Sequence, residues 1–203
     1  MVTTETEEKI LIAARNVFIK RGFDGARMQE IADESGINKA LLHYYFRNKS
    51  KLFEKIYLEC LQKFFSGLWQ ILNSEFAFND KISSVVDYYT KFLYENPFLP
   101  QFIIVESNRN PDKMKEFLSR WWEDKIEEQK FAKEYELLVR EGKFIDMDFV
   151  QFFSSMIALC IFPTIAKNML QIIFKMNDNN YHNFLEVRKE QITKFIINGI
   201  TKQ

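Results

Sequence analysis

Apolar residues along the chain recur at the spacing of helices. Near the N-terminus, Ile10, Ala13, Ala14, Val17 and Phe18 follow the intervals that place residues on one helical face. No stretch shows the sustained alternation of apolar and polar residues that is typical of a strand. The pattern predicts an all-α protein with helices at residues 7–21, 28–35, 37–46, 50–72, 81–94, 98–107, 112–141, 148–174 and 181–200.

Two short predicted helices within residues 28–52 are separated by a tight turn. Ser35-Gly36 ends the first of them, and Asn38 is placed to cap the second. Two short helices joined by a glycine-containing turn are typical of a helix-turn-helix, whose second helix enters the major groove of DNA. The helix before them would complete a three-helix unit. We therefore expect a DNA-binding domain over residues 1–51 and a larger helical bundle over residues 52–203.

Charge supports this interpretation locally and not globally. The chain has 28 Lys and Arg against 28 Asp and Glu, which argues against a general polyanion-binding protein. From Gly36 to Lys51, however, Lys39, Arg47, Lys49 and Lys51 occur without any acidic residue. Lysines in the first turn of a helix oppose its dipole, at about 0.3–1 kcal/mol each. A DNA phosphate at that N-terminus would reverse the sign of this effect.

A set of residues at fixed spacing across the first 52 positions matches a known pattern. The set is Ala13-Ala14, Phe18, Gly22-Phe23, Ile31-Ala32, Ser35-Gly36-Ile37, Lys39, Leu42, Tyr45-Phe46, Asn48-Lys49 and Leu52. It resembles the DNA-binding domain of TetR-family transcriptional regulators. The chain departs from the family at two places. Ala26-Arg27 stands where Thr-Ser or Thr-Thr is common, and residues 40–43 read Ala-Leu-Leu-His where Gly-Thr-Leu-Tyr is common.

The resemblance implies which residues meet double-stranded DNA. Ile37, Leu42 and Phe46 would face the small core, and the other side chains of the second helix would face outward. Lys49 is expected to contact a phosphate, and Arg27 to replace the phosphate contact of the missing hydroxyl residue. The expected DNA-binding residues are Arg27, Asn38, Lys39, Ala40, Leu41, His43, Tyr44, Arg47 and Lys49.

Two of these residues each have a second interpretation. An outward Leu41 is unusual for a solvated helix, and against DNA it could meet a thymine methyl group, with Ala40 allowing close approach. Alternatively, Leu41 is partly buried. His43 either donates a hydrogen bond to a phosphate or is an ordinary surface histidine.

The segment 149–166 carries no charge over 18 residues. Such a helix is buried, packs on another subunit, or approaches the length of a membrane span. Gln151, Pro163 and Lys167 weaken the membrane interpretation. TetR relatives dimerise through their last two helices, so the resemblance implies a homodimer that is formed by residues 148–174 and 181–200.

Aromatic residues are concentrated in the larger domain, which holds 18 of the 21 Phe and all three Trp. Aromatic rings usually fill a core, but they also line apolar pockets. TetR relatives bind small molecules in this domain, so we expect an apolar or amphipathic effector. The candidate effector-binding residues are Phe65, Trp69, Tyr88, Phe92, Phe102, Trp121, Phe153 and Met156.

No enzymatic, metal-binding or cofactor-binding pattern is present in the sequence. The two histidines, His43 and His182, lie outside any metal motif, and no Ser or Cys stands in a nucleophile motif. Cys60 and Cys160 are expected to be buried, reduced thiols in a cytoplasmic protein. We therefore expect a homodimeric TetR-like repressor without a cofactor or membrane association. The alternative is an all-α small-molecule or partner-protein binding module that does not read DNA.

Overall fold

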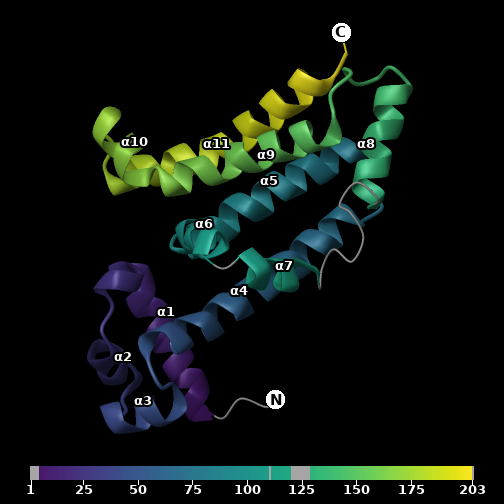
Figure 1. Ribbon diagram of the computed structural model, residues 1–203. Helices are drawn as coiled ribbons and strands as arrows, with labels where there is room; N and C mark the ends of the chain where they lie inside the picture. Colours follow the sequence, from purple (N-terminus) through teal and green to yellow (C-terminus); the bar gives the residue numbers. More distant parts are fainter. Residues whose placement is uncertain (1–4, 110, 120–128, 203) are drawn as a thin grey trace. The chain divides into compact units, whose positions relative to one another are not determined.

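The computed structural model describes residues 5–109, 111–119 and 129–202 (Figure 1). The predicted all-α fold is confirmed, because the described residues form helices and no named strand, apart from an isolated antiparallel bridge between Phe144 and Thr201. Contacts divide the chain into two compact units, Met1–Phe64 and Phe65–Gln203, which we call the N-terminal unit and the C-terminal unit.

The N-terminal unit is a small helical domain around an aromatic core. Phe53 packs edge-on against Phe18 and Phe23, with ring centroids 4.8 and 5.0 Å apart. Gly22 has a φ of 67° and interrupts the first helix close to its predicted end. The helices of this unit are α1 (Glu5–Gly25), α2 (Met28–Ser35), α3 (Lys39–Tyr45) and the first part of α4 (Lys49–Leu72).

The division between the units falls inside α4, later than the boundary expected at residues 51 and 52. The first turns of α4 bury Leu52, Phe53 and Ile56. Phe53 makes its ring contacts with α1, so these turns belong to the core of the N-terminal unit. The sequence shows α4 as one uninterrupted helix and therefore gives no mark of this division.

The C-terminal unit is built on α5, which lies against both α9 and α11 (Figure 1). Eight residues along α5 are buried, and one of them is a lysine. The helices that follow α4 are α5 (Phe78–Glu95), α6 (Leu99–Arg109), α7 (Pro111–Ser119), α8 (Lys130–Arg140), α9 (Phe149–Ile165), α10 (Lys167–Ile173) and α11 (Asp178–Ile200).

The prediction of one long helix over residues 112–141 is wrong. α7 ends at Ser119, and α8 begins at Lys130 after an extended Gln129 with φ −72° and ψ 154°. Residues 120–128 lie outside the described residues. The segment contains neither Gly nor Pro, so the sequence offers no break signal. The start of α8 follows instead from tertiary packing, because Phe131 and Tyr135 are buried in the core.

An aromatic cluster forms this part of the core. The Phe78 ring stacks on Phe131 with centroids 4.7 Å apart, and the Tyr135 ring stacks on Phe152 at 4.5 Å. Burial raises the pKa of Tyr135, and its hydroxyl donates a hydrogen bond to the carbonyl of Met147 at 3.0 Å. The cluster joins the start of α5 to α8 and α9.

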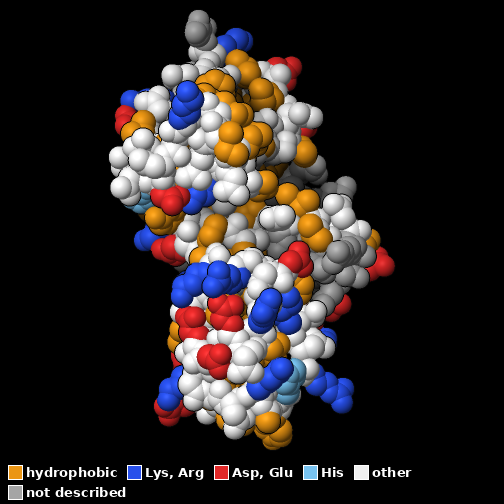
Figure 2. All heavy atoms as spheres, turned by 90° about the vertical axis from the view of Figure 1, so that its left-hand side faces the viewer, with side chains coloured by type: hydrophobic (Ala, Val, Ile, Leu, Met, Phe, Trp, Pro, Cys, Tyr) orange, Lys and Arg blue, Asp and Glu red, His pale blue; other side chains and the backbone are white. Residues whose placement is uncertain are grey.

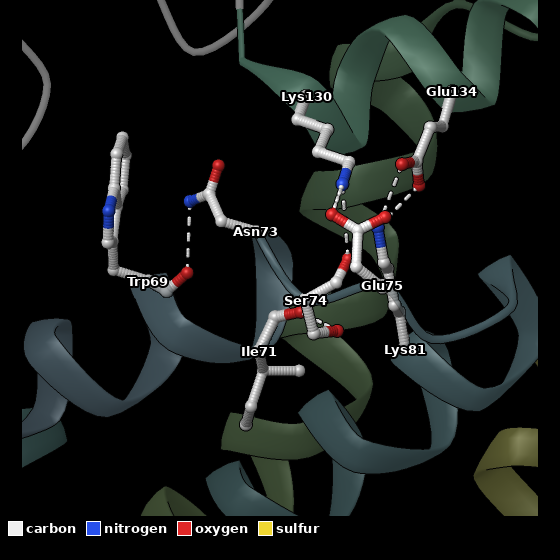
Figure 3. Close-up of polar contacts among 8 residues, drawn as sticks. All are labelled: Trp69, Ile71, Asn73, Ser74, Glu75, Lys81, Lys130 and Glu134. Carbon is white, nitrogen blue, oxygen red and sulfur yellow. Dashed lines mark hydrogen bonds and ion pairs between the residues drawn. The ribbon is translucent and has the colours of Figure 1, made fainter.

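Two ion pairs hold the start of α8 next to α5 and the loop before it (Figure 3). Lys81 is fully buried, and its Nζ lies 2.9 and 2.6 Å from the two carboxylate oxygens of Glu134. Lys130 binds Glu75 at 2.6 Å on the surface. The loop itself is closed by local bonds, including one from the Asn73 side-chain amide to the carbonyl of Trp69.

The apolar segment predicted as one helix over residues 148–174 is divided into α9 and α10. The two helices are bent by 71° at a break at Ala166. Pro163 has no N–H, so the carbonyl of Leu159 lacks its helical donor. Arg188 of α11 supplies one at 3.2 Å, and the Tyr181 hydroxyl donates to the carbonyl of Pro163 at 2.9 Å. Side chains of α11 thus complete the hydrogen bonding of the broken end of α9.

Within the described part of the chain, no single helix has both the length and the hydropathy of a membrane span. Only α9 and α10 taken together pass that test, and they are the bent pair. Buried residues such as Phe152 and Met156 on one face of α9 are typical of a core helix.

Candidate nucleic-acid interface

The turn between α2 and α3 is shaped by Gly36. Its φ of 69° lies in the left-handed region, and its N–H donates to the carbonyls of Ala32 and Asp33. The N–H of Ile37 also donates to the Ala32 carbonyl, at 3.1 Å. These bonds end α2 and reverse the chain, so that α3 begins at Lys39.

Asn38 caps α3, as the sequence predicted. Its Oδ1 accepts a hydrogen bond from the backbone N–H of Leu41 at 2.8 Å. Leu42 and Phe46 are buried, as expected, Ile37 and Tyr45 are half-buried, and the other side chains are exposed. We call these exposed side chains the α3 outer face; they are Asn38, Lys39, Ala40, Leu41, His43 and Tyr44.

The hydrogen bond of His43 limits what its ring can do. Nδ1 lies 3.2 Å from the carbonyl of Arg47, and a carbonyl only accepts, so Nδ1 carries a proton. In the neutral ring, Nε2 is then an acceptor. Phosphate oxygens also accept, so His43 binds a phosphate through Nε2 only as the imidazolium.

The acidic side chains of α2 are engaged by neighbouring residues within the unit. Glu30 pairs with Arg21 of α1 at 3.2 Å, and Glu34 lies 3.6 Å from Lys20. Asp33 accepts a hydrogen bond from Gln29 at 2.8 Å. Because residues 36–51 contain no acid, the charges carried by α3 and the turn after it are positive. A negatively charged partner would meet little repulsion there.

The first departure from the TetR pattern, Ala26-Arg27, consists of one buried and one exposed residue. Ala26 is buried. Arg27 precedes α2 with an extended backbone, and its exposed side chain makes no capping hydrogen bond. A free guanidinium beside the start of α2 is suited to a phosphate.

Lys49 lies where the sequence placed it, at the start of α4, but its ammonium group points into the N-terminal unit. Its Nζ donates to the carbonyls of Phe23, Asp24 and Ala26 at 2.7, 3.2 and 3.1 Å, and it lies over the Phe23 ring. An ammonium has three protons, and three carbonyls accept them. Lys49 thus ties α4 to the chain between α1 and α2. Sequence reasoning missed this contact, because no linear signal connects Lys49 to residues 23–26.

The expected effector-binding residues are distributed over several helices of the C-terminal unit. Tyr88 of α5 packs closely on α4, since a Cβ added at Gly67 would come within 2.3 Å of its hydroxyl oxygen. The side chain of Phe102 and all of Trp121 lie outside the described residues. Of the remaining candidates, Phe65, Trp69 and Tyr88 are half-buried, whereas Phe92, Phe153 and Met156 are buried.

The C-terminal unit has an open groove between α5 and α11 that none of these candidates lines. Most of its lining residues are charged or polar, and Lys189 of α11 crosses it to Asp87 of α5 at 3.4 Å while also binding Glu186. The sequence analysis did not identify this groove, because its charged residues lie far apart in the sequence. Its mixture of charges is typical of a solvated helix contact rather than of an apolar effector site.

Both cysteines are buried thiols that are not joined in a disulfide, as the sequence predicted. Burial raises the pKa of the Cys60 thiol, and it raises the pKa of Cys160 to about 12. The reactive form of cysteine is the thiolate, so neither thiol is activated for nucleophilic chemistry. Among the described residues, no group of His, Cys, Asp and Glu is arranged to hold a metal ion.

Comparison with known proteins identifies the N-terminal unit. Residues 10–56 match the model of the bacterial regulatory proteins of the tetR family. The transcriptional activator FasR of Mycolicibacterium smegmatis is 30% identical over 44% of this chain and 41% of its own length. The transcriptional repressor NicS of Pseudomonas putida is 30% identical over 52% of this chain and 48% of its length. The chain thus spans less than half of these relatives.

Solved structures match nearly the whole chain. A TetR/AcrR-family regulator from Thermobifida fusca has a TM-score of 0.66 at 17% identity, covering 97% of this chain and 98% of its own. The regulator FadR from Bacillus subtilis, solved in complex with stearoyl-CoA, has a TM-score of 0.65 at 14% identity, with coverage of 95% and 98%. At these identities the matches establish the fold alone. The chain thus carries the helix-turn-helix sequence of the tetR family at residues 10–56, on a fold that is similar to that of TetR/AcrR-family regulators.

Proposed function

We propose that the protein is a cytoplasmic one-component repressor, which binds a pseudo-palindromic operator as a homodimer and is released by a small effector. The observation that carries this proposal is the α3 outer face, which belongs to a capped helix and lies in an acid-free stretch of the sequence, residues 36–51. The relatives include an activator and a repressor, and the second supports repression here.

On this proposal, α3 lies in the major groove and basic residues around it hold the backbone. Arg27 and Arg47 are exposed and hold phosphates, and the imidazolium form of His43 adds a third contact. Lys39, Ala40, Leu41 and Tyr44 lie against the bases, while the free amide NH₂ of Asn38 donates to the backbone. Lys49 reaches a phosphate only if it releases carbonyls that it now binds.

The homodimer that we propose uses α9, α10 and α11. Phe162 and Phe195 are 51% and 69% exposed on α9 and α11, and Val187 of α11 is also exposed. Figure 2, which views the side on which α10 lies, shows hydrophobic side chains gathered on the surface of the C-terminal unit. An apolar surface of this kind favours burial against a second copy. The opposite face of α9 is buried within its own chain.

The effector that we propose is an apolar or amphipathic molecule bound in the C-terminal unit. Tyr88 and Phe92 stack with ring centroids 6.1 Å apart, next to α4. The structurally similar FadR was solved with stearoyl-CoA, an amphipathic ligand, and this supports the class of molecule but not its identity. Binding there would act by changing the distance between two α3 helices, which must meet half-sites about one DNA turn (~34–36 Å) apart.

The test is selection of binding sites from random duplex DNA by the purified chain, at near-physiological salt. We expect an enriched two-fold related sequence, bound less tightly as salt rises. A matched pair of variants controls the result. The double variant Lys39→Ala, Tyr44→Ala should lose the enriched sequence, whereas Lys9→Ala, on α1, should keep it. Failure to enrich any sequence with effector-free protein would favour the alternative binding module.

A further inference from the structure

The α3 outer face has few groups that can form hydrogen bonds with bases. Asparagine reads adenine by presenting its amide oxygen and its NH₂ together to the base edge. The oxygen of Asn38 is already bound to the backbone N–H of Leu41 at 2.8 Å. Asn38 therefore retains only a donor for DNA and cannot make the two-point contact with adenine while it caps α3.

The other polar side chains of this face offer little that is specific to a base. Nδ1 of His43 is bound to the carbonyl of Arg47, so only Nε2 is free. Lys39 carries a flexible ammonium with three donors, which can meet a guanine edge or a phosphate. The α3 outer face contains no Arg or Gln. Two-point hydrogen bonding by a planar guanidinium or amide side chain is thus unavailable from this face.

The centre of the face is apolar instead. Leu41 is 37% exposed, whereas its neighbour Leu42 is fully buried in the same turn of helix. Ala40 is exposed beside it, and Tyr44, one turn later on the same side, is 83% exposed. Leu41 is thus partly buried, the second of its two interpretations, but unlike Leu42 it keeps more than a third of its surface exposed. A solvated helix would carry a polar residue at position 41.

The major groove offers one apolar group to such a surface, the C5 methyl of thymine. We propose that Leu41 is a specificity-determining residue, which packs against a thymine methyl group in each half-site, with Ala40 allowing the approach. This inference rests on the operator binding proposed above. It names the chemistry that α3 reads, which is a methyl group rather than a hydrogen-bonding edge.

Deoxyuridine provides a direct test, because it has the hydrogen-bonding edge of thymidine and lacks only the methyl group. Each thymine of the selected operator is replaced singly by deoxyuridine, and binding by the wild-type chain is measured at fixed salt. We expect about fourfold weaker binding at one position per half-site. That is the loss for one buried methyl-sized group, about 0.8 kcal/mol. The remaining thymines should show no change.

A protein variant tests whether Leu41 is the residue that contacts the methyl group. In Leu41→Ala the deoxyuridine effect at that position should disappear, because the leucine that meets the methyl is gone. Alanine favours helix, and position 41 is partly exposed, so the variant should fold. Ile12→Ala, which truncates an exposed aliphatic residue on α1, is the matched control and should retain the full fourfold effect.

The possible results separate this inference from the function on which it rests. Enrichment of an operator in which no thymine is sensitive to methyl removal would overturn the role of Leu41 and leave the regulator intact. An effect at the sensitive position that is unchanged in Leu41→Ala would overturn that role as well. Failure to select any duplex overturns both the inference and the proposed function. A sensitive position that is lost only with Leu41 establishes methyl readout.

Discussion

Lys49 illustrates how a single residue can fit two roles that the sequence cannot distinguish. Its place after a capping asparagine predicts a phosphate contact. The structure has its ammonium bound to three carbonyls of the chain between α1 and α2. The lysine charge that opposes the dipole of α4 is thus compensated inside the protein, without DNA.

We expect Lys49→Met to lower the free energy of unfolding by about 1–3 kcal/mol, because charged hydrogen bonds to three carbonyls are lost. Urea unfolding measures this change. Lys51→Met is the control, since Lys51 is largely exposed and pairs only with Glu54, and it should cost less than about 0.5 kcal/mol. The salt dependence of operator binding should keep its slope in Lys49→Met. A slope flatter by about one unit, with stability unchanged, would instead make Lys49 a phosphate contact.

The buried pair of Lys81 and Glu134 should respond unequally to loss of either partner. Glu134→Ala leaves a fully buried ammonium without its carboxylate and should cost about 3–5 kcal/mol. Lys81→Met leaves a carboxylate whose side chain is 31% exposed, which water can solvate, so it should cost less. Urea unfolding of both variants shows which one loses more free energy of unfolding. Lys130→Met, which breaks the exposed pair with Glu75, should lower the free energy of unfolding least of the three, because water and salt screen this pair. Equal costs for the first two variants would contradict this account.

At the scale of elements, helix ends were predictable wherever a residue with a local signal marks them. Gly36 and Asn38 ended α2 and capped α3 as expected, because their effects depend only on nearby backbone groups. The break between α7 and α8 was missed, since it depends on the burial of Phe131 and Tyr135 by distant residues. Pro163 was visible in the sequence, but the compensation by Arg188 was not, because it comes from another helix.

That compensation predicts coupling between Pro163 and Arg188. Arg188→Met should cost about 1–3 kcal/mol in the wild-type chain, because the carbonyl of Leu159 loses its donor. In a Pro163→Ala background the restored N–H can bond to Leu159, so the same change should cost at least about 1 kcal/mol less. A double-mutant cycle in urea measures the difference. Lys189→Met is the control, because Lys189 is next to Arg188 but pairs with Asp87 and Glu186. Its effect on the free energy of unfolding should be additive with that of Pro163→Ala.

At the scale of the whole molecule, the sequence predicted the helical class from its apolar spacing. It also predicted the TetR-like helix-turn-helix, because many residues of that motif lie at fixed spacing within a short stretch. The division at Phe64–Phe65 was not predictable, since it depends on which core each turn of α4 enters. The candidate α3 residues were found exposed, whereas the effector candidates vary from half-buried to buried. Aromatic residues form cores and pockets alike, so composition cannot separate the two.

The proposed dimer predicts a change in assembly from single surface substitutions. Phe162→Arg or Phe195→Arg places a charge in the apolar surface of α9 or α11 and should convert a dimer to a monomer at micromolar concentration. Sedimentation velocity measures the mass. Phe76→Arg, at another exposed phenylalanine, in the loop before α5, should leave the dimer unchanged. A wild-type chain that is monomeric in this assay would refute the homodimer.

The contacts of Lys49 also affect how much a matching residue says about function. A lysine that binds the chain between α1 and α2 stabilises the domain, whether or not the protein meets DNA. Selection for folding alone would keep it in a descendant that had lost its operator. Its presence in a sequence is therefore informative about ancestry and folding. The residues that carry information about the DNA are those the fold leaves free to vary, Ala40, Leu41 and His43.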